Sequence, residues 1–271
     1  MTTGTDAKRR PWLAARRLVT ELLPFAVGIA VWQGLSSLKI WPPVLFPSPL
    51  QVLHAFVADL ASGVLLVNLG VSLRSLGLGF LVGAGIAVPL GYLMGLNRAS
   101  RDFFDPLVNL LQAIPGLAWI PFAILWFGLG QGAVTFIIVM SVFFPLLHNL
   151  LTGIRTVQPV LVEAVQTLGA RRKDVIAHVI FPATLPNLMT GVRLGIAFGF
   201  RSLVGGEMIA STDGIGYAIF IAQQYFQSAR IVVGMLAIGI TWLIMDRLIL
   251  RPIEQRTTMR WGLMRDGLDN T

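Results

Sequence analysis

The sequence predicts an all-α integral membrane protein, and two observations carry that prediction. Of its 271 residues, 55% are hydrophobic and only 13% are charged, whereas a soluble domain is about 45–50% apolar and about a quarter charged. The apolar residues also gather in runs of about 20, which is the length that a helix needs to cross the hydrocarbon core of a bilayer. We therefore expect one membrane-embedded helical bundle.

Six candidate membrane spans occur along the chain. The first carries Glu21 and Pro24 near its start, where the headgroup region and the first helical turn tolerate both. No clear signal-peptide cleavage site follows the basic segment ahead of it, so we expect a retained helix. The spans cover approximately residues 18–38, 69–95, 103–129, 133–151, 188–210 and 231–250.

Basic residues alternate between two sets of connections. They are frequent in the N-terminal segment, around Arg98 and Arg101, in the loop from 152 to 187 and in the C-terminal tail, whereas the other connections carry at most one. Cytoplasmic loops are enriched in Lys and Arg, so both termini are expected in the cytoplasm, which requires an even number of spans. The net charge is +8. Because the basic residues are distributed over several connections and do not form one patch, we expect no nucleic-acid partner.

Two connections have helical patterns of their own. After the proline-rich stretch 42–49, residues 50–60 predict an amphipathic helix lying at the external interface. In the loop 152–187, a short helix is expected to begin at Pro159 and to end at Gly169, and a second one from Arg171 to Phe181 is expected to stop at Pro182. The residues alone leave open whether this basic loop is a docking knob or an ordinary connection.

The chain lacks the residues that ATP hydrolysis and metal chemistry need. It has no cysteine and three histidines, which are far apart in sequence. No G-x-x-x-x-G-K-[ST] phosphate loop is present, and the glycine-rich stretch 128–132 has no lysine. We therefore expect no enzymatic activity, no metal site and no cofactor in this chain, with the energy for any ATP-driven process coming from a partner.

The cytoplasmic loop resembles the EAA signature of ABC importer permeases. The resemblance rests on Glu163-Ala164-Val165, Leu168-Gly169-Ala170 and residues 180–186, with Val165 replacing the usual second alanine. Further motifs resemble the nitrate, taurine and aliphatic-sulfonate branch of that family, so that the likeness covers roughly residues 30–250. These motifs lie at 47–49, 72–76, 114–121, 126–130, 190–194 and 205–210.

The resemblance implies a fold, partners and a site. It implies a type I ABC importer permease fold of six transmembrane helices, working as a homodimer in the bacterial inner membrane. ATP-binding-cassette ATPase subunits would bind ATP and Mg, and an external binding protein would deliver a small anionic solute such as a sulfonate, taurine, nitrate or bicarbonate. A coupling helix would dock on the ATPase through Glu163, Ala164, Leu168, Gly169, Ala170, Arg171, Arg172 and Lys173.

The same resemblance divides the chain into three regions. Residues 1–65 would hold the cytoplasmic N-terminus, the first span and the external amphipathic segment. Residues 66–250 would form the transmembrane core domain, and residues 251–271 a cytoplasmic tail.

Polar residues inside the third and fifth spans predict a translocation path. Glutamine and prolines interrupt the third span, and broken helices at membrane depth are tolerated where they are buried in protein or line a watery path. A charge at the bilayer centre costs on the order of 3 kcal/mol and normally faces a cavity or a partner. The predicted path residues are Gln112, Pro115, Trp119, Pro121, Arg201 and Glu207.

Each of these features also has a purely structural interpretation. The prolines could serve only as packing kinks, and Arg201, which stands where the branch commonly has tryptophan, could pair with a carboxylate on another helix. Pairing with Glu207 is not expected, because residues six apart on a helix lie about 240° apart around its axis. Arg193, near the cytoplasmic end, is expected to extend toward the interface.

Two other function classes compete with an ABC permease. A secondary transporter or channel would need no ATPase and no docking loop, so that co-purification with an ATPase separates the two classes. A membrane scaffold is disfavoured because Arg201 and Glu207 are costly to keep in a span without a role.

The charge pattern predicts the topology, and single cysteines test it cleanly because the chain has none. A cysteine replacing Ser62 should react with an impermeant thiol reagent in intact spheroplasts, and one replacing Thr258 should react only after lysis. The opposite labelling pattern would overturn the predicted orientation.

Overall fold

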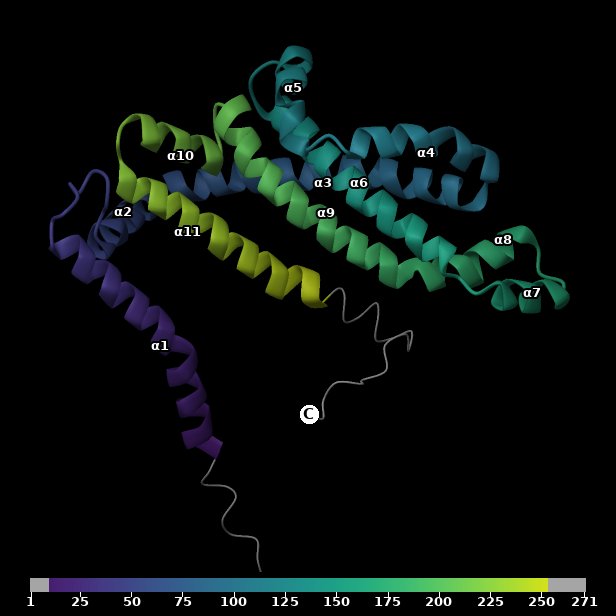
Figure 1. Ribbon diagram of the computed structural model, residues 1–271, viewed down its shortest axis with the longest axis horizontal. Coiled ribbons are helices and arrows are strands. Elements are labelled where there is room, and N and C mark those ends of the chain that lie inside the picture. The colour runs from purple at the N-terminus through teal and green to yellow at the C-terminus, as the bar shows by residue number, and fades with distance from the viewer. Residues whose placement is uncertain (1–9, 253–271) are drawn as a thin grey trace, which may run out of the picture.

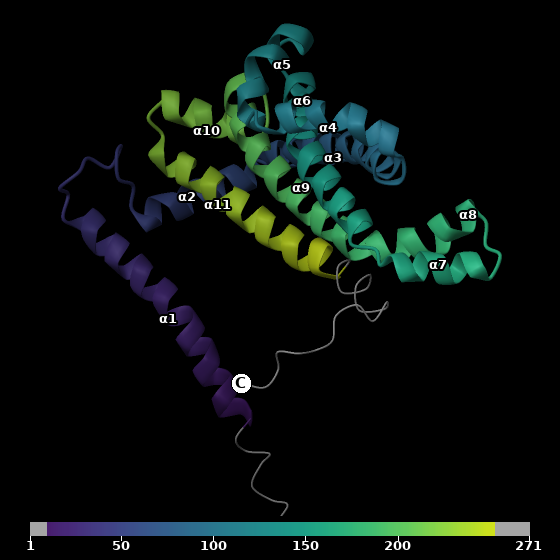
Figure 2. The same cartoon turned by 45° about the vertical axis from the view of Figure 1, so that its right-hand side comes forward.

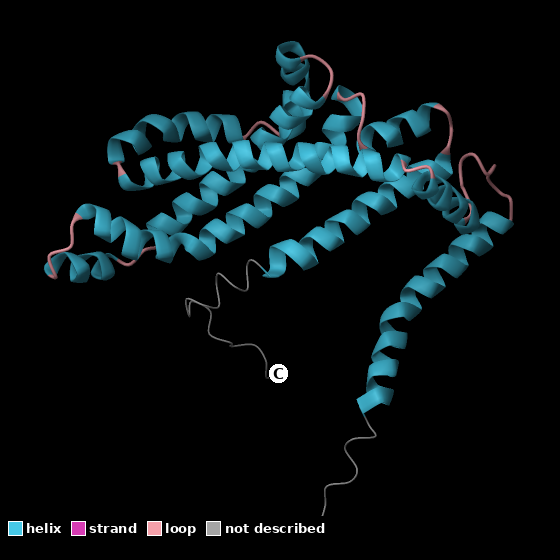
Figure 3. Cartoon of the chain, turned by 180° about the vertical axis from the view of Figure 1, so that it is seen from behind, coloured by secondary structure: helices cyan, strands magenta, loops and turns pink. Residues whose placement is uncertain are grey.

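The computed structural model describes residues 10–252, with side chains from Leu23 onward. Within that range every regular element is a helix, as the sequence predicts (Figure 3). Most of the predicted tail, residues 251–271, lies outside the described residues, as do residues 1–9.

Helix α6 (Gln131–Arg155) forms the centre of the bundle and packs against α3 (Val64–Leu96) and α9 (Phe181–Ala210). Its buried face includes Ile138, Val142 and Leu146, none of which has any exposed area. The neighbouring helices meet this face with glycines, because small residues let membrane helices approach closely. These are Gly79, Gly83 and Gly91 on α3 and Gly191, Gly195 and Gly199 on α9.

Among the described residues, four helices are long and apolar enough to cross a membrane: α3, α6, residues 172–210 and residues 228–250. A fifth span is formed if α4 (Arg98–Gln112) and the segment 116–127 count together, although they are bent by 92° at their junction. The predicted third span is therefore a broken segment, since Pro115 and Pro121 interrupt it. The described apolar part of α1 (Arg10–Ser37) is shorter than a span, and the count of six stays a prediction.

The expected stop at Pro182 is wrong. After α8 (Arg172–Val175), the chain passes through a π-helical turn at residues 176–180 and continues directly into α9, so that residues 172–210 form one continuous helical segment. Pro182 lies in the first turn after the π segment. A π turn changes the hydrogen-bond register, which accommodates a ring that would clash with a regular preceding turn.

The helices α2 (Pro49–Ala61), α10 (Ile215–Gln224) and α11 (Ser228–Met245) form a smaller layer at one end of the bundle (Figure 1). Their shared core includes Val52, Ile219 and Val233. Ser48 caps α2 through a capping box with Gln51, so the predicted helix after the prolines is confirmed.

No other described residue covers the outer face of α2 or most of α1 from Leu23 to Ser37. Leu53 and Val57 of α2 are each 55% exposed, as an interfacial helix requires. Helix α1 extends away from the bundle in both views (Figures 1 and 2). Its link to the remainder includes the Trp32 indole, which donates a 3.0 Å hydrogen bond to the carbonyl of Pro47.

The close approach of α3 to α6 gives a stability prediction. A Cβ at residue 79 would lie 2.5 Å from Cγ2 of Ile138, whereas one at residue 77 would meet nothing within 4 Å. Gly79→Leu should therefore destabilise the bundle by at least about 1–3 kcal/mol, the usual cost of overpacking. Gly77→Leu is the matched control, because both changes raise helix propensity equally. Equal thermal unfolding temperatures of the two purified variants in detergent would contradict the packing.

Candidate functional site

Arg201 lies on the face of α9 that no other described helix covers. The open face carries Thr190, Leu194 and Phe198 as well, all of them exposed. The guanidinium carbon sits 5.8 Å from the centre of the Phe198 ring, within the range of a cation–π contact. The cation is therefore held against an aromatic ring while remaining accessible.

Two neighbouring segments limit this open face. One turn beyond Arg201 on the same face, Gly205 packs against Leu117 of the short helix η1 (Gly116–Trp119). On one flank, Arg193 forms an ion pair of 2.9 Å with Asp246, which lies directly after α11. Arg201 lies on this open strip about 14 Å along the axis from the end of α9 at Ala210.

Three other arginines near the spans, Arg193, Arg251 and Arg101, have polar partners. Arg193 and Arg251 both pair with the buried Asp246, at 2.9 and 3.0 Å, so Arg193 has a carboxylate partner that the sequence did not indicate. Arg101 donates to two backbone carbonyls at the end of α3. Among residues 23–252, Arg201 has no carboxylate within ion-pair distance, so the structural pairing with another helix is not seen there.

The broken third span reaches the same strip through η1. The 92° bend lies at residues 113–115, between α4 and the arm formed by η1 and α5 (Ile120–Phe127). Pro115 precedes η1, and Pro121 lies in the first turn of α5. Gly116 sits beside a 2.7 Å hydrogen bond between Ser141 of α6 and Ser202 of α9. The break is thus fixed to the core beside Arg201.

The other predicted path residues of this segment have different surroundings. The indole of Trp119 packs between Phe122 and Phe136, with ring centroids 6.3 and 6.2 Å away, and its buried N–H has no partner among the described residues. Gln112 is exposed and donates a 3.0 Å hydrogen bond to Asn109 on its own helix. The structure brings η1 to Arg201 but shows no contact between Gln112 and Arg201.

Glu207 points away from Arg201 and is fully buried. Its carboxylate accepts hydrogen bonds from the Ser72 hydroxyl at 2.7 and 2.9 Å and from the backbone N–H of Gly216 at 2.8 Å. The N–H of Ile215 in turn donates to Ser72 at 2.9 Å. A buried charge needs such partners, and here they fasten the start of α10 to α3. The described contacts of Glu207 are structural.

The sequence did not indicate the polar cluster around Gln131. Gln131, the first residue of α6, hydrogen bonds to Ser75, Ser211 and Asp213. Sequence reasoning also missed Asp246, although a carboxylate inside the apolar run 231–250 was a signal. Within residues 10–252, no group of three or more His, Asp or Glu side chains could hold a metal ion.

The predicted coupling residues project from the opposite end of the molecule (Figures 1 and 2). They span α7 (Pro159–Thr167), a tight turn and α8. Leu168 is 86% exposed, and Glu163 and Lys173 are exposed as well. The loop is therefore a protruding element, and its role as a docking site stays a prediction.

Gly169 sets the shape of this loop. Its φ is +85°, a left-handed conformation that glycine adopts at no steric cost, and it ends α7 as the sequence predicts. Past the turn, the N–H of Arg171 donates to Asp174 at 3.0 Å, and Arg172 donates to the carbonyl of Leu96 at 3.3 Å. These two contacts tie the far side of the loop to α8 and to the end of α3.

Long apolar helices, a helix broken at membrane depth beside an accessible cation, and a protruding basic loop together define a multi-pass membrane transport protein. Comparison with known proteins supplies the family. Residues 87–249 match the family described as binding-protein-dependent transport system inner membrane component. The chain belongs to this family and is the permease subunit of an ABC importer, which confirms the resemblance seen in the sequence.

Several relatives align over most of both chains. A putative ABC transporter permease of Methanocaldococcus jannaschii is 36% identical over 89% of this chain and 91% of its own. A taurine transport system permease of Escherichia coli is 31% identical over 91% of each chain. A putative aliphatic sulfonates transport permease of Bacillus subtilis is 32% identical over 98% of this chain and 96% of its own.

Proposed function

We propose that this permease imports a small oxyanion, such as a sulfonate, and that Arg201 lies on the path of that solute. The observation that carries the proposal is an accessible guanidinium in a membrane span with no carboxylate partner among residues 23–252. Such a charge is costly to keep in a membrane without an anion or water. Arginine also presents planar N–H pairs that match the oxygens of sulfonate, carboxylate or nitrate. The names of the taurine and sulfonate relatives support the same solute class.

The working unit in this proposal is a homodimer with two ATPase subunits and an external binding protein. A second copy facing the open strip of α9 would enclose the path and place two Arg201 side chains across it. Two like charges facing one aqueous path raise its positive potential and attract anions. The solute would then cross as the dimer alternates its access, with both termini of each chain in the cytoplasm.

The protruding loop is proposed to dock on the ATPase. Its exposed surface combines the aliphatic side chains of Val160, Leu161 and Leu168 with the charges of Glu163 and Lys173. An apolar contact surrounded by charges is the usual composition of a protein interface. ATP and Mg would be bound by the partner, and this chain would supply only the contact.

The left-handed turn at Gly169 gives the first functional prediction. Gly169→Val should leave membrane insertion intact but uncouple solute-stimulated ATPase activity from transport, because a β-branched residue is strained at a positive φ. A Cβ there would meet no atom within 4 Å, so the effect is conformational. Gly169→Asn is the matched control, since asparagine tolerates this conformation. Normal coupling in the valine variant, measured in proteoliposomes with the ATPase and binding protein, would refute the docking role.

The second functional prediction concerns Arg201. Arg201→Gln should slow uptake of the anion by about tenfold or more, the size of one lost charge-assisted hydrogen bond. Arg201→Lys should recover only part of the rate, since lysine keeps the positive charge but lacks the planar pair of N–H donors. The measurement is uptake by the reconstituted complex with its binding protein present.

A matched control separates a local role from a general loss of charge. Arg74 is also an exposed cation within a span, but it lies on the side of α3 opposite to Ser72 and the core. Arg74→Gln should leave uptake unchanged. Unchanged uptake in Arg201→Gln would remove Arg201 from the path, and failure of that variant to assemble with the ATPase would assign it to structure.

A further inference from the structure

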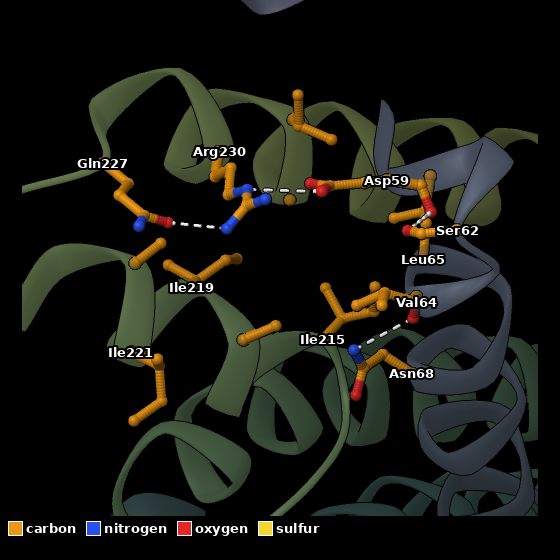
Figure 4. Close-up of a pocket in the computed structure, with 14 residues that line it drawn as sticks. Asp59, Ser62, Val64, Leu65, Asn68, Ile215, Ile219, Ile221, Gln227 and Arg230 are labelled. Atoms are coloured by element: carbon orange, nitrogen blue, oxygen red, sulfur yellow. Dashed lines mark hydrogen bonds and ion pairs between the residues drawn. The ribbon is translucent and has the colours of Figure 1, made fainter. Parts of the chain in front are cut away.

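A cavity of about 350 Å³ lies where α2, α3, α10 and α11 meet (Figure 4). Its interior is apolar and includes Leu65, Ile215, Ile219 and Val233. None of the residues placed on the solute path or in the docking loop lines it. The cavity is therefore separate from the transport site described above.

Charged and polar groups gather along one side of this cavity. Arg230 forms an ion pair with Asp59 at 3.2 Å and donates to the Gln227 side chain at 2.9 Å, so that its guanidinium bridges α11 and α2 (Figure 4). The side chain of Arg230 is 52% exposed and that of Asp59 15% exposed. The Nη2 group of Arg230 and the side-chain nitrogen Nε2 of Gln227 have no partner among the described residues, and both are hydrogen-bond donors.

The other polar groups of the cavity are already used. The Ser62 hydroxyl donates to the carbonyl of Asp59 at 3.2 Å. The amide of Asn68 donates to the carbonyl of Val64, and its oxygen accepts from the N–H of Gly214 at 3.1 Å. The cavity thus offers surplus donors on one side of an apolar interior. That chemistry fits an oxyanion head group attached to a short apolar chain.

The position of the cavity indicates where such a ligand comes from. Its walls include the first turns of two membrane spans, which begin at Val64 and Ser228, and the end of α2, whose outer face exposes apolar side chains. The ends of spans lie at the level of the lipid headgroups. A phospholipid at this level places its phosphate within reach of Arg230 and its glycerol and upper acyl carbons against the apolar wall.

From these contacts we propose that this cavity is a binding site for a phospholipid, with the phosphate on Arg230 and Gln227. The bound lipid joins α2 to the layer formed by α10 and α11. Asp59 lies beside the phosphate position and suits an ammonium-bearing headgroup. A free alkyl sulfonate also combines an oxyanion with an apolar chain. The experiment must therefore distinguish phospholipid binding from alkyl sulfonate binding.

The test measures the thermal unfolding temperature of purified, delipidated permease in detergent. The probes are short-chain phosphatidylethanolamine, the matching diacylglycerol, and 1-hexanesulfonate. We expect the phospholipid to raise the unfolding temperature in a saturable way, the diacylglycerol to do so only weakly because it lacks the phosphate, and the sulfonate to have no effect. A saturable response to the sulfonate alone would overturn the assignment to lipid.

Three variants test whether the phospholipid binds in this cavity. Arg230→Gln should raise the phospholipid concentration at half-effect by about tenfold, the value of one charge-assisted hydrogen bond. Ala218→Leu, which fills part of the cavity without touching the ion pair, should weaken binding as well. Arg155→Gln is the matched control, because Arg155 is also 52% exposed and paired with an aspartate, Asp105, away from this cavity. Equal phospholipid responses in all three variants would overturn the site, since they would mean nonspecific lipid binding.

Discussion

The contact of α6 with two glycine-bearing helices governs where the polar groups of this protein lie. Once α3 and α9 pack closely against α6, the rotation of each helix about its own axis is fixed. The side of α9 toward α3 then carries Glu207, and the open side carries Arg201. Because interior packing is dense, neither helix can rotate appreciably without losing this fit. The opposite placements of the carboxylate and the guanidinium follow from a packing constraint among apolar residues.

Features determined by neighbours in sequence could be predicted without the structure. The apolar spacing of residues 50–60 predicts a helix after the prolines, and α2 with its capping box at Ser48 confirms it. Glycine at position 169 predicts a helix end, and its left-handed backbone agrees. The charge pattern and the apolar runs predict a helical membrane bundle, and the family match agrees with it. These signals act within a few residues, where local sterics and hydrogen bonding decide the conformation.

Features determined by distant residues could not be predicted. Helical angles exclude Arg201 as the partner of Glu207, but they do not indicate Ser72, which is 135 positions away. The partner of Arg193 lies on a different helix, so its pairing with Asp246 needed the tertiary arrangement. Pro182 misled the sequence analysis because a rule about regular helices was applied where a π turn precedes the proline. The prolines of the third span indicated a break but not its angle.

The continuous helical segment from residue 172 to residue 210 has a mechanical consequence. Its 39 residues follow a path of about 58 Å at the rise of a helix, from the base of the protruding loop past Arg201 to the Glu207 anchor. No loop interrupts this path, and α8 turns relative to α9 at the π turn of residues 176–180 (Figure 1). A force applied to the protruding loop would therefore act on the rest of α9 through that one turn, and the stiffness of the turn would set how much of the displacement reaches Arg201.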